Sequence, residues 1–307
     1  MTAAAQSSWQ PTSREQAALG RQAHVQGLGR VDQVWPWLKS HHGEVMAVDA
    51  PHAAHPERLS YRQLAERIDQ AAAAFRGLGI NSGDVVGLFA ENSPRWLVAD
   101  QGLMRAGAID AVRGAAAPVE ELRYILEDSA AVALVVQTAD LLQRLQLTQE
   151  QREQLRFLLV LEGPAPQGAF DFDAFLALAD GQEAPDPITG RDIASAPDTT
   201  ATILYTSGTT GRPKGVPLTH ANLLHQMRSL ACVTRPEPGS PVLSVLPIWH
   251  SYERSAEYYF FSCACSQSYT TIKQLKKDLP RVKPVIMATV PRLWEAVQAG
   301  FEDAVKT

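Results

Sequence analysis

The chain has 307 residues, of which 45% are hydrophobic and 20% are charged, and its net charge is −5. This composition is typical of a soluble globular protein with one large or two medium α/β lobes, and the acidic balance argues against a nucleic-acid partner. Three cysteines cannot form a disulfide framework, and the sequence has neither a secretory signal nor a run of about 18 apolar residues. We therefore expect a cytoplasmic protein without a transmembrane segment, and a peripheral membrane contact stays open.

Helical and strand patterns alternate over residues 31–162, after a loosely held leader expected at residues 1–30. Ser60 is expected to cap a helix, and Ser93 followed by Pro94 opens another. Strands are predicted at VMAVDA, VVGLFA, Ala133–Val136 and Leu155–Leu161, and further helices at Val119–Glu127 and Leu141–Gln146. Strands that alternate with helices indicate parallel sheets covered by helices, so this stretch is predicted to be a first α/β lobe.

Residues 163–198 carry several turn signals and are expected to connect two lobes, with a short helix at Phe170–Leu178. The second lobe, residues 199–307, begins with the strand ATILYT, which is followed by a polar loop and a helix capped by Thr219. PVLSVLP and VIMATV are predicted strands, and Pro291 opens a last helix. The fold class is therefore α/β, with helix-covered, largely parallel sheets in two lobes.

The strongest functional signal is the segment Tyr205–Gly215, YTSGTTGRPKG, at the carboxyl end of a predicted strand. Parallel α/β sheets bind ligands at this edge. The glycines let the backbone approach a bulky anion, and the hydroxyl side chains and Lys214 are donors that suit a polyphosphate. The segment is not a Walker loop, because the required Gly-Lys-Ser/Thr is absent. A flexible linker is the alternative, and the strand before it and the capped helix after it argue against that.

YTSGTTGRPKGVPLTHANL resembles the phosphate loop of the adenylate-forming, or AMP-binding, superfamily. LPIWHSYER and KPVIMATVPRLWEAV resemble segments of its long-chain fatty acid branch, the acyl-CoA and acyl-acyl-carrier-protein synthetases, and AIDAVRG is most similar to relatives that use the carrier protein. The resemblance runs from about residue 31 to the end and implies a truncated large N-terminal domain. It implies an acid–thiol ligase that uses ATP to convert a long-chain fatty acid into an acyl-adenylate, and then into a thioester with CoA or acyl carrier protein.

The same resemblance assigns roles to individual residues. His250 would be a hydrogen-bond donor between the adenylate and the acyl pocket, and together with Lys214 it is the candidate catalytic residue. Trp249 and Tyr252 would line the acyl and adenylate pocket with His250, whereas Glu253 and Arg254 are expected in a structural ion pair or helix cap. Magnesium would bridge the ATP phosphates, which are assigned to Thr206, Ser207, Gly208, Thr209, Thr210, Gly211 and Lys214.

The later motifs of the family do not occur in this sequence: the magnesium glutamate, the ribose aspartate and the lysine of the mobile lid. No metal ligand is therefore assigned here, the magnesium glutamate is expected beyond residue 307, and this chain alone is expected to be inactive. Two alternatives stay open, a ligase for an aryl or other acid and a non-catalytic nucleotide-binding fragment. Cys263 and Cys265 are expected to be buried small hydrophobes rather than a metal site, since no third ligand is nearby.

Overall fold

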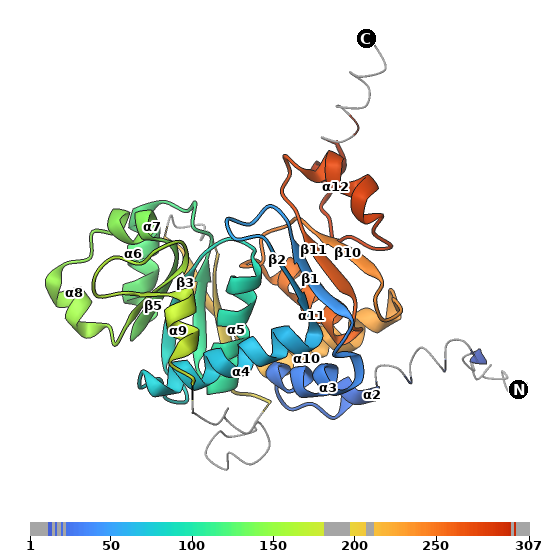
Figure 1. Cartoon of the computed structure of the whole chain (residues 1–307), viewed down its shortest axis with the longest axis horizontal. Coiled ribbons are helices and arrows are strands. Elements are labelled where there is room, and N and C mark those ends of the chain that lie inside the picture. Colours follow the sequence, from blue (N-terminus) through green and yellow to red (C-terminus); the bar gives the residue numbers. More distant parts are fainter. Residues whose placement is uncertain are drawn as a thin grey trace, which may run out of the picture.

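The strands of the chain form two sheets, as seen in a computed structural model that describes residues 23–180, 197–206 and 212–295 together with residues 12, 13, 16, 20 and 298 (Figure 1). The larger sheet contains β3 (Val85–Phe89), β4 (Ile109–Arg113), β5 (Ala133–Thr138), β6 (Leu158–Glu162), β7 (Phe170–Asp171), β8 (Thr200–Thr206) and β9 (Lys214–Thr219). The smaller one contains β1 (Met46–Ala50), β2 (Glu57–Ser60), β10 (Pro241–Ser244) and β11 (Ser266–Tyr269).

Most strand pairs are parallel, which confirms the predicted fold class. The larger sheet has the order β7-β6-β5-β3-β4-β8-β9, in which only β8 and β9 pair antiparallel. The smaller sheet has the order β10-β11-β1-β2, in which only β1 and β2 pair antiparallel. Parallel neighbours require crossover connections, and helices provide most of these connections here.

Helices cover both faces of the larger sheet (Figure 1). They are α2 (Ala23–Gln26), α3 (Val34–His42), α4 (Tyr61–Gly77), α5 (Pro94–Ala106), α6 (Val119–Asp128), α7 (Ala139–Arg144), α8 (Gln149–Gln154), α9 (Phe172–Ala177), α10 (His220–Ser229), α11 (Ser251–Ser262) and α12 (Leu275–Val282), with short 3-10 turns at Val31–Gln33 and Leu230–Cys232. On β3, Val86 and Leu88 pack with α4, α5 and α9, whereas Phe89 packs with α6 and α7. This alternation is the two-residue period of a strand that is buried on both faces.

Sequence capping signals are confirmed at three helices, because the predicted side chains accept backbone hydrogen bonds. Ser60 accepts from Gln63 at the start of α4, and Ser93 accepts from Trp96 at the start of α5. Thr219 accepts from Asn222 at the start of α10. These local signals therefore placed the beginnings of the helices correctly.

The sheets do not follow the two predicted lobes, because each combines strands from residues 31–162 and from residues 199–307. In the larger sheet β8 pairs with β4, and in the smaller sheet β11 pairs with β1. Residues 163–180, predicted as part of a connecting segment, add β7 and α9 to the larger sheet, and residues 181–196 lie outside the described residues. Neighbours in a parallel sheet need not be neighbours in the chain, so contiguous lobes do not follow from alternating elements.

Residues 23–30 lie within the stretch predicted as a loosely held leader, and they are packed against the body of the protein. Val25 is buried, and the Arg228 guanidinium donates to the carbonyl oxygens of Val25 and Leu28 at 3.2 and 2.8 Å. Arg30 is also buried and pairs with Asp32 at 3.0 Å. The leader is therefore shorter than predicted.

Two predicted elements of the second half are wrong. Residues 214–219, predicted as part of a polar loop, form the edge strand β9, and the exposed edge of a sheet tolerates Pro217. VIMATV is not a regular strand, since only Ile286 makes a bridge, to Val242.

In the described part of the chain, no helix combines the length and the apolar character needed to cross a bilayer.

Candidate functional site

The phosphate-loop segment connects two paired strands at one edge of the larger sheet. β8 ends at Thr206 and β9 begins at Lys214, and these two residues are direct partners in the antiparallel register. Both side chains are exposed. The pairing therefore holds a hydroxyl and an ammonium group together at the carboxyl end of β8. The other predicted phosphate ligands, Ser207, Gly208, Thr209, Thr210 and Gly211, lie outside the described residues.

The segment between β10 and α11 is attached to the carboxyl end of β3. Asn92 accepts a hydrogen bond from the backbone of Ile248 at 2.9 Å and donates to the carbonyl oxygen of Leu246 at 2.7 Å. These two bonds bring the strand end that precedes His250 to the carboxyl edge of the larger sheet. Sequence reasoning missed Asn92, although it is a polar residue directly after a predicted buried strand.

Trp249 is fixed by three contacts on the same edge. Its indole Nε1 donates to Glu91 at 3.1 Å, and the Arg113 guanidinium lies 4.8 Å from the ring centroid. A Cβ atom at Gly114 would stand only 2.5 Å from Nε1, so this close approach requires glycine. Trp249 and His250 are not among the residues that line the cavity between α10 and α11 described below, and their predicted role in the acyl and adenylate pocket stays a prediction.

His250 is exposed and occupies the N-cap position of α11. Its Nδ1 accepts a hydrogen bond from the backbone of Tyr252 at 3.4 Å. In the neutral ring the proton is therefore on Nε2, which is the nitrogen able to donate to an oxygen of a ligand. This arrangement is consistent with the predicted donor role of His250.

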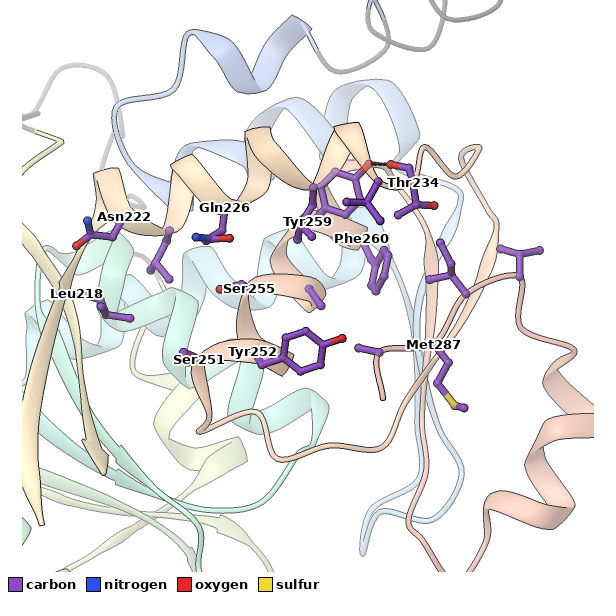
Figure 2. A pocket seen from close by; sticks show the side chains of 17 residues that line it. Leu218, Asn222, Gln226, Thr234, Ser251, Tyr252, Ser255, Tyr259, Phe260 and Met287 are labelled. Carbon is purple, nitrogen blue, oxygen red and sulfur yellow. Dashed lines mark hydrogen bonds between the residues drawn. The ribbon is translucent and has the colours of Figure 1, made fainter. Parts of the chain in front are cut away.

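A cavity of about 890 Å³ lies between α10, α11 and residues 285–288 (Figure 2). Its lining is largely apolar, with Leu223 from α10, Phe260 from α11 and Met287 on the third side. Tyr252, which is 50% exposed, lines it near the start of α11. The volume and the apolar lining are typical of a small-molecule site.

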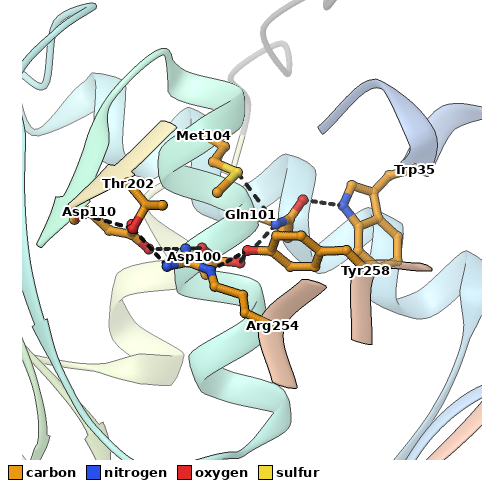
Figure 3. Close-up of polar contacts among 8 residues, drawn as sticks. All are labelled: Trp35, Asp100, Gln101, Met104, Asp110, Thr202, Arg254 and Tyr258. Atoms are coloured by element: carbon orange, nitrogen blue, oxygen red, sulfur yellow. Dashed lines mark hydrogen bonds and ion pairs between the residues drawn. The ribbon is translucent and has the colours of Figure 1, made fainter. Parts of the chain in front are cut away.

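The cavity wall on α11 is held by a buried ionic network (Figure 3). Arg254 donates to the carboxylates of Asp100 on α5 and Asp110 on β4, the latter at 2.7 Å, and to the Thr202 hydroxyl on β8 at 2.7 Å. Tyr258, one turn further along α11, donates to Asp100 at 2.5 Å. Arg254 thus has a structural ionic role, as expected, but its ion-pair partners are Asp100 and Asp110 and not Glu253.

Glu253 contacts the smaller sheet, through Ser244 of β10. Its carboxylate accepts a hydrogen bond from the Ser244 hydroxyl at 2.5 Å, and its other oxygen has no partner among the described residues. Burial raises the pKa of Glu253 to about 8, because the charged form loses its hydration. Glu253 is therefore protonated at neutral pH and does not form an ion pair.

We expect Glu253→Gln to reduce the pH dependence of stability. Because the folded-state pKa is raised from 4.5 to about 8, the stability contributed by the protonated carboxyl is complete below pH 4.5 and is lost as the pH rises to 8. Relative to the wild type, the variant should gain at least about 1.4 kcal/mol between about pH 5 and pH 8, the equivalent of one pKa unit. Urea unfolding at both pH values measures this gain. Glu127→Gln, at an exposed position, is the control. If the free energy of unfolding of Glu253→Gln changes between the two pH values as much as that of the control, the prediction is contradicted.

No group of three or more His, Cys, Asp or Glu side chains suited to a metal ion occurs within the described residues. Cys263 and Cys265 are buried in a cluster with Tyr259 and Phe260, and neither forms a disulfide. The predicted role of both cysteines as buried small hydrophobes is thereby confirmed.

A helix-covered parallel sheet with a hairpin loop at its carboxyl edge, next to a largely apolar cavity, defines an α/β ligand-binding domain. A family model described as AMP-binding enzyme matches residues 37–306, and the chain belongs to this family.

Two curated relatives are long-chain fatty acid ligases. A chloroplastic long-chain-fatty-acid–[acyl-carrier-protein] ligase of Arabidopsis thaliana is 37% identical over 90% of this chain and 40% of its own length. A long-chain-fatty-acid–CoA ligase of Mycobacterium tuberculosis is 30% identical over 85% of this chain and 46% of its own length. The chain thus spans less than half the length of these relatives.

Solved structures of the same fold include ligases for different acids. The crystal structure of a long-chain-fatty-acid–CoA ligase from Archaeoglobus fulgidus superposes with a TM-score of 0.76 at 21% identity, covering 89% of this chain and 54% of that one. An anthranilate–CoA ligase in complex with anthranoyl-AMP has a TM-score of 0.75 at 19% identity, with coverage of 86% and 50%. The fold is therefore shared, and it does not distinguish between these acids.

Proposed function

We propose that this chain is the N-terminal portion of an enzyme that uses ATP to activate a long-chain fatty acid and transfers the acyl group to CoA or acyl carrier protein. The observation that carries the proposal is the apolar cavity of about 890 Å³ beside the phosphate-loop edge. A long alkyl chain suits its lining, because each buried methylene contributes about 0.8 kcal/mol. The sequence similarity to long-chain fatty acid ligases supports this choice over an aryl acid.

The residues at the strand ends fit the phosphates of ATP. In our proposal the Thr206 hydroxyl and the Lys214 ammonium, paired across β8 and β9, hold the phosphate oxygens together with residues 207–211. ATP, when bound, would supply the α-phosphorus that the fatty acid carboxylate attacks, and the bond to the leaving pyrophosphate breaks. Negative charge builds up on the phosphoryl oxygens during this attack, so positioned donors lower the barrier electrostatically.

His250 and Tyr252 would link the two halves of the site in this proposal. The Nε2 of His250 donates to an oxygen of the carboxylate or the adenylate, and Tyr252 forms the mouth of the acyl cavity. Magnesium would accompany the ATP phosphates in this proposal, and no ligand for it is assigned among the described residues. We propose a cytoplasmic location, and leave both a peripheral membrane contact and the choice between CoA and acyl carrier protein to experiment.

The full-length protein should catalyse ATP–pyrophosphate exchange far better with dodecanoate to octadecanoate than with acetate or cinnamate. Filling the cavity by Ser255→Phe should selectively reduce activity with the longest acids, and Ser255→Ala is the matched control that adds no volume. Equal exchange with acetate would overturn the long-chain assignment, and preferential exchange with cinnamate would favour the aryl alternative. Pyrophosphate release by the 307-residue chain alone would contradict the expected need for the later motifs.

A further inference from the structure

The last turn of α6 contacts the residue that precedes the phosphate loop. Tyr205, which is only 5% exposed, donates a hydrogen bond from its phenol to Oδ2 of Asp128 at 2.8 Å. Tyr124, one turn earlier on α6, donates to Oδ1 of the same carboxylate at 2.9 Å. Asp128 therefore accepts two phenol hydrogen bonds, one from its own helix and one from the end of β8.

The residues that follow the loop contact the same two tyrosines, Tyr124 and Tyr205. The Arg212 guanidinium lies over the ring of Tyr124, 5.7 Å from its centroid. Gly215 is the register partner of Tyr205, and a Cβ atom there would stand 3.1 Å from the Cζ atom of the Tyr205 ring. Both ends of the loop are thus fixed through contacts with Tyr124 and Tyr205.

Asp128 is unfavourably placed for the stability of its own helix. It is the last residue of α6, directly after Glu127, and the last turn contains no basic residue. A carboxylate at this end is repelled by the partial negative charge of the helix terminus. The two phenol hydrogen bonds are the favourable contacts of this carboxylate. One comes from Tyr124 of the same helix, and the other comes from Tyr205, which is far away in the sequence on β8.

We infer that Asp128 is a positioning residue for the phosphate loop, acting through Tyr205 and, by way of Tyr124, through Arg212. Its carboxylate sets the position of both loop ends, and so it presents Thr206 and Lys214 to the phosphates. The inference rests on the proposed function to the extent that the ligand of the loop is ATP. The contacts that hold Tyr205 and Arg212 are present in the free protein.

In the full-length protein, Asp128→Ala should raise the KM for ATP about three- to tenfold, a modest effect because the carboxylate is exposed. The KM for the fatty acid should not change, and the melting temperature should stay the same or rise because the unfavourable helix-terminal charge is removed. Tyr205→Phe, which keeps the ring, should have a similar effect. The double variant should be no worse than the stronger single one, since both substitutions remove the same hydrogen bond between Tyr205 and Asp128.

Glu127→Ala is the matched control, because it removes the adjacent carboxylate, which accepts a hydrogen bond from Gln151 on α8. An Asp128→Ala variant with an unchanged KM for ATP, in an active background, would overturn the inference. A lower melting temperature together with a rise in both KM values would also overturn it, since that pattern indicates a merely structural role.

A second measurement does not depend on activity. Without nucleotide, trypsin should cleave after Lys214 several-fold faster in Asp128→Ala than in Glu127→Ala, as followed by mass spectrometry of the 307-residue chain. Equal cleavage rates would overturn the inference even if the enzyme is active. If pyrophosphate exchange fails in the wild type while cleavage differs as expected, the proposed function fails and the positioning role stands.

Discussion

Replacing Arg254 by methionine should destabilise the 307-residue chain by about 3–5 kcal/mol, the usual cost of removing one partner from a buried ionic network. Arg254 is fully buried, and its guanidinium pairs with two carboxylates, those of Asp100 and Asp110. Methionine fills a similar volume but leaves both carboxylates without their cation. Because the network joins α11 to α5, β4 and β8, its loss weakens the attachment of α11 to the larger sheet. Urea unfolding followed by circular dichroism measures the change.

The matched control is Arg144→Met, which removes a second arginine from an ion pair with an aspartate. The side chains of Arg144 and Asp140 are 48% and 77% exposed, so we expect a cost of less than about 1 kcal/mol. Adding Asp110→Asn to Arg254→Met should restore part of the lost stability, since one buried charge is then removed. If Arg254→Met costs no more than the control, the network does not hold α11 in place.

Replacing Lys214 by alanine in the full-length protein is expected to reduce ATP–pyrophosphate exchange about ten- to a hundredfold, the usual effect of losing a charge-assisted contact in a transition state. The KM for the fatty acid should change little, because Lys214 is at the phosphate-loop edge and does not line the cavity. The fold should not change, because backbone atoms form the ladder between β8 and β9 and the Lys214 side chain is exposed.

Lys276→Ala provides the comparison for this result, since Lys276 is an exposed lysine on α12. Its removal should leave the exchange rate and both KM values unchanged. Unaltered exchange in Lys214→Ala would show that the loop does not hold the phosphates through this residue. An equal loss in both lysine variants would indicate a general effect of net charge.

Most elements of the first half could be predicted from the sequence because their signals are local. Ser93 and Pro94 at the start of α5, and the period of apolar residues along α4, depend only on residues within one or two turns. α11 gives no such signal. Its buried Glu253, Arg254 and Glu257 interrupt the apolar pattern, and their partners lie on other elements.

Some residues of the candidate site could likewise be predicted from the sequence, whereas others could be found only in the structure. The phosphate loop and His250 could be identified because each belongs to a short contiguous motif. The Asn92–Ile248 contact joins residues 156 positions apart, and the position of Trp249 depends on Glu91, Arg113 and Gly114. No spacing in the sequence predicts such pairs.

The sequence by itself therefore determined the α/β class, the beginnings of the capped helices α4, α5 and α10, the loop chemistry and the resemblance to the family. Only the tertiary structure decided which segments share a sheet, where the cavity lies and how Asp128 contacts the loop. The physical reason is the distance along the chain over which each interaction acts. Capping and periodicity act within a few residues of one chain segment, whereas sheets, cavities and buried ion pairs form between segments whose contact depends on the whole fold.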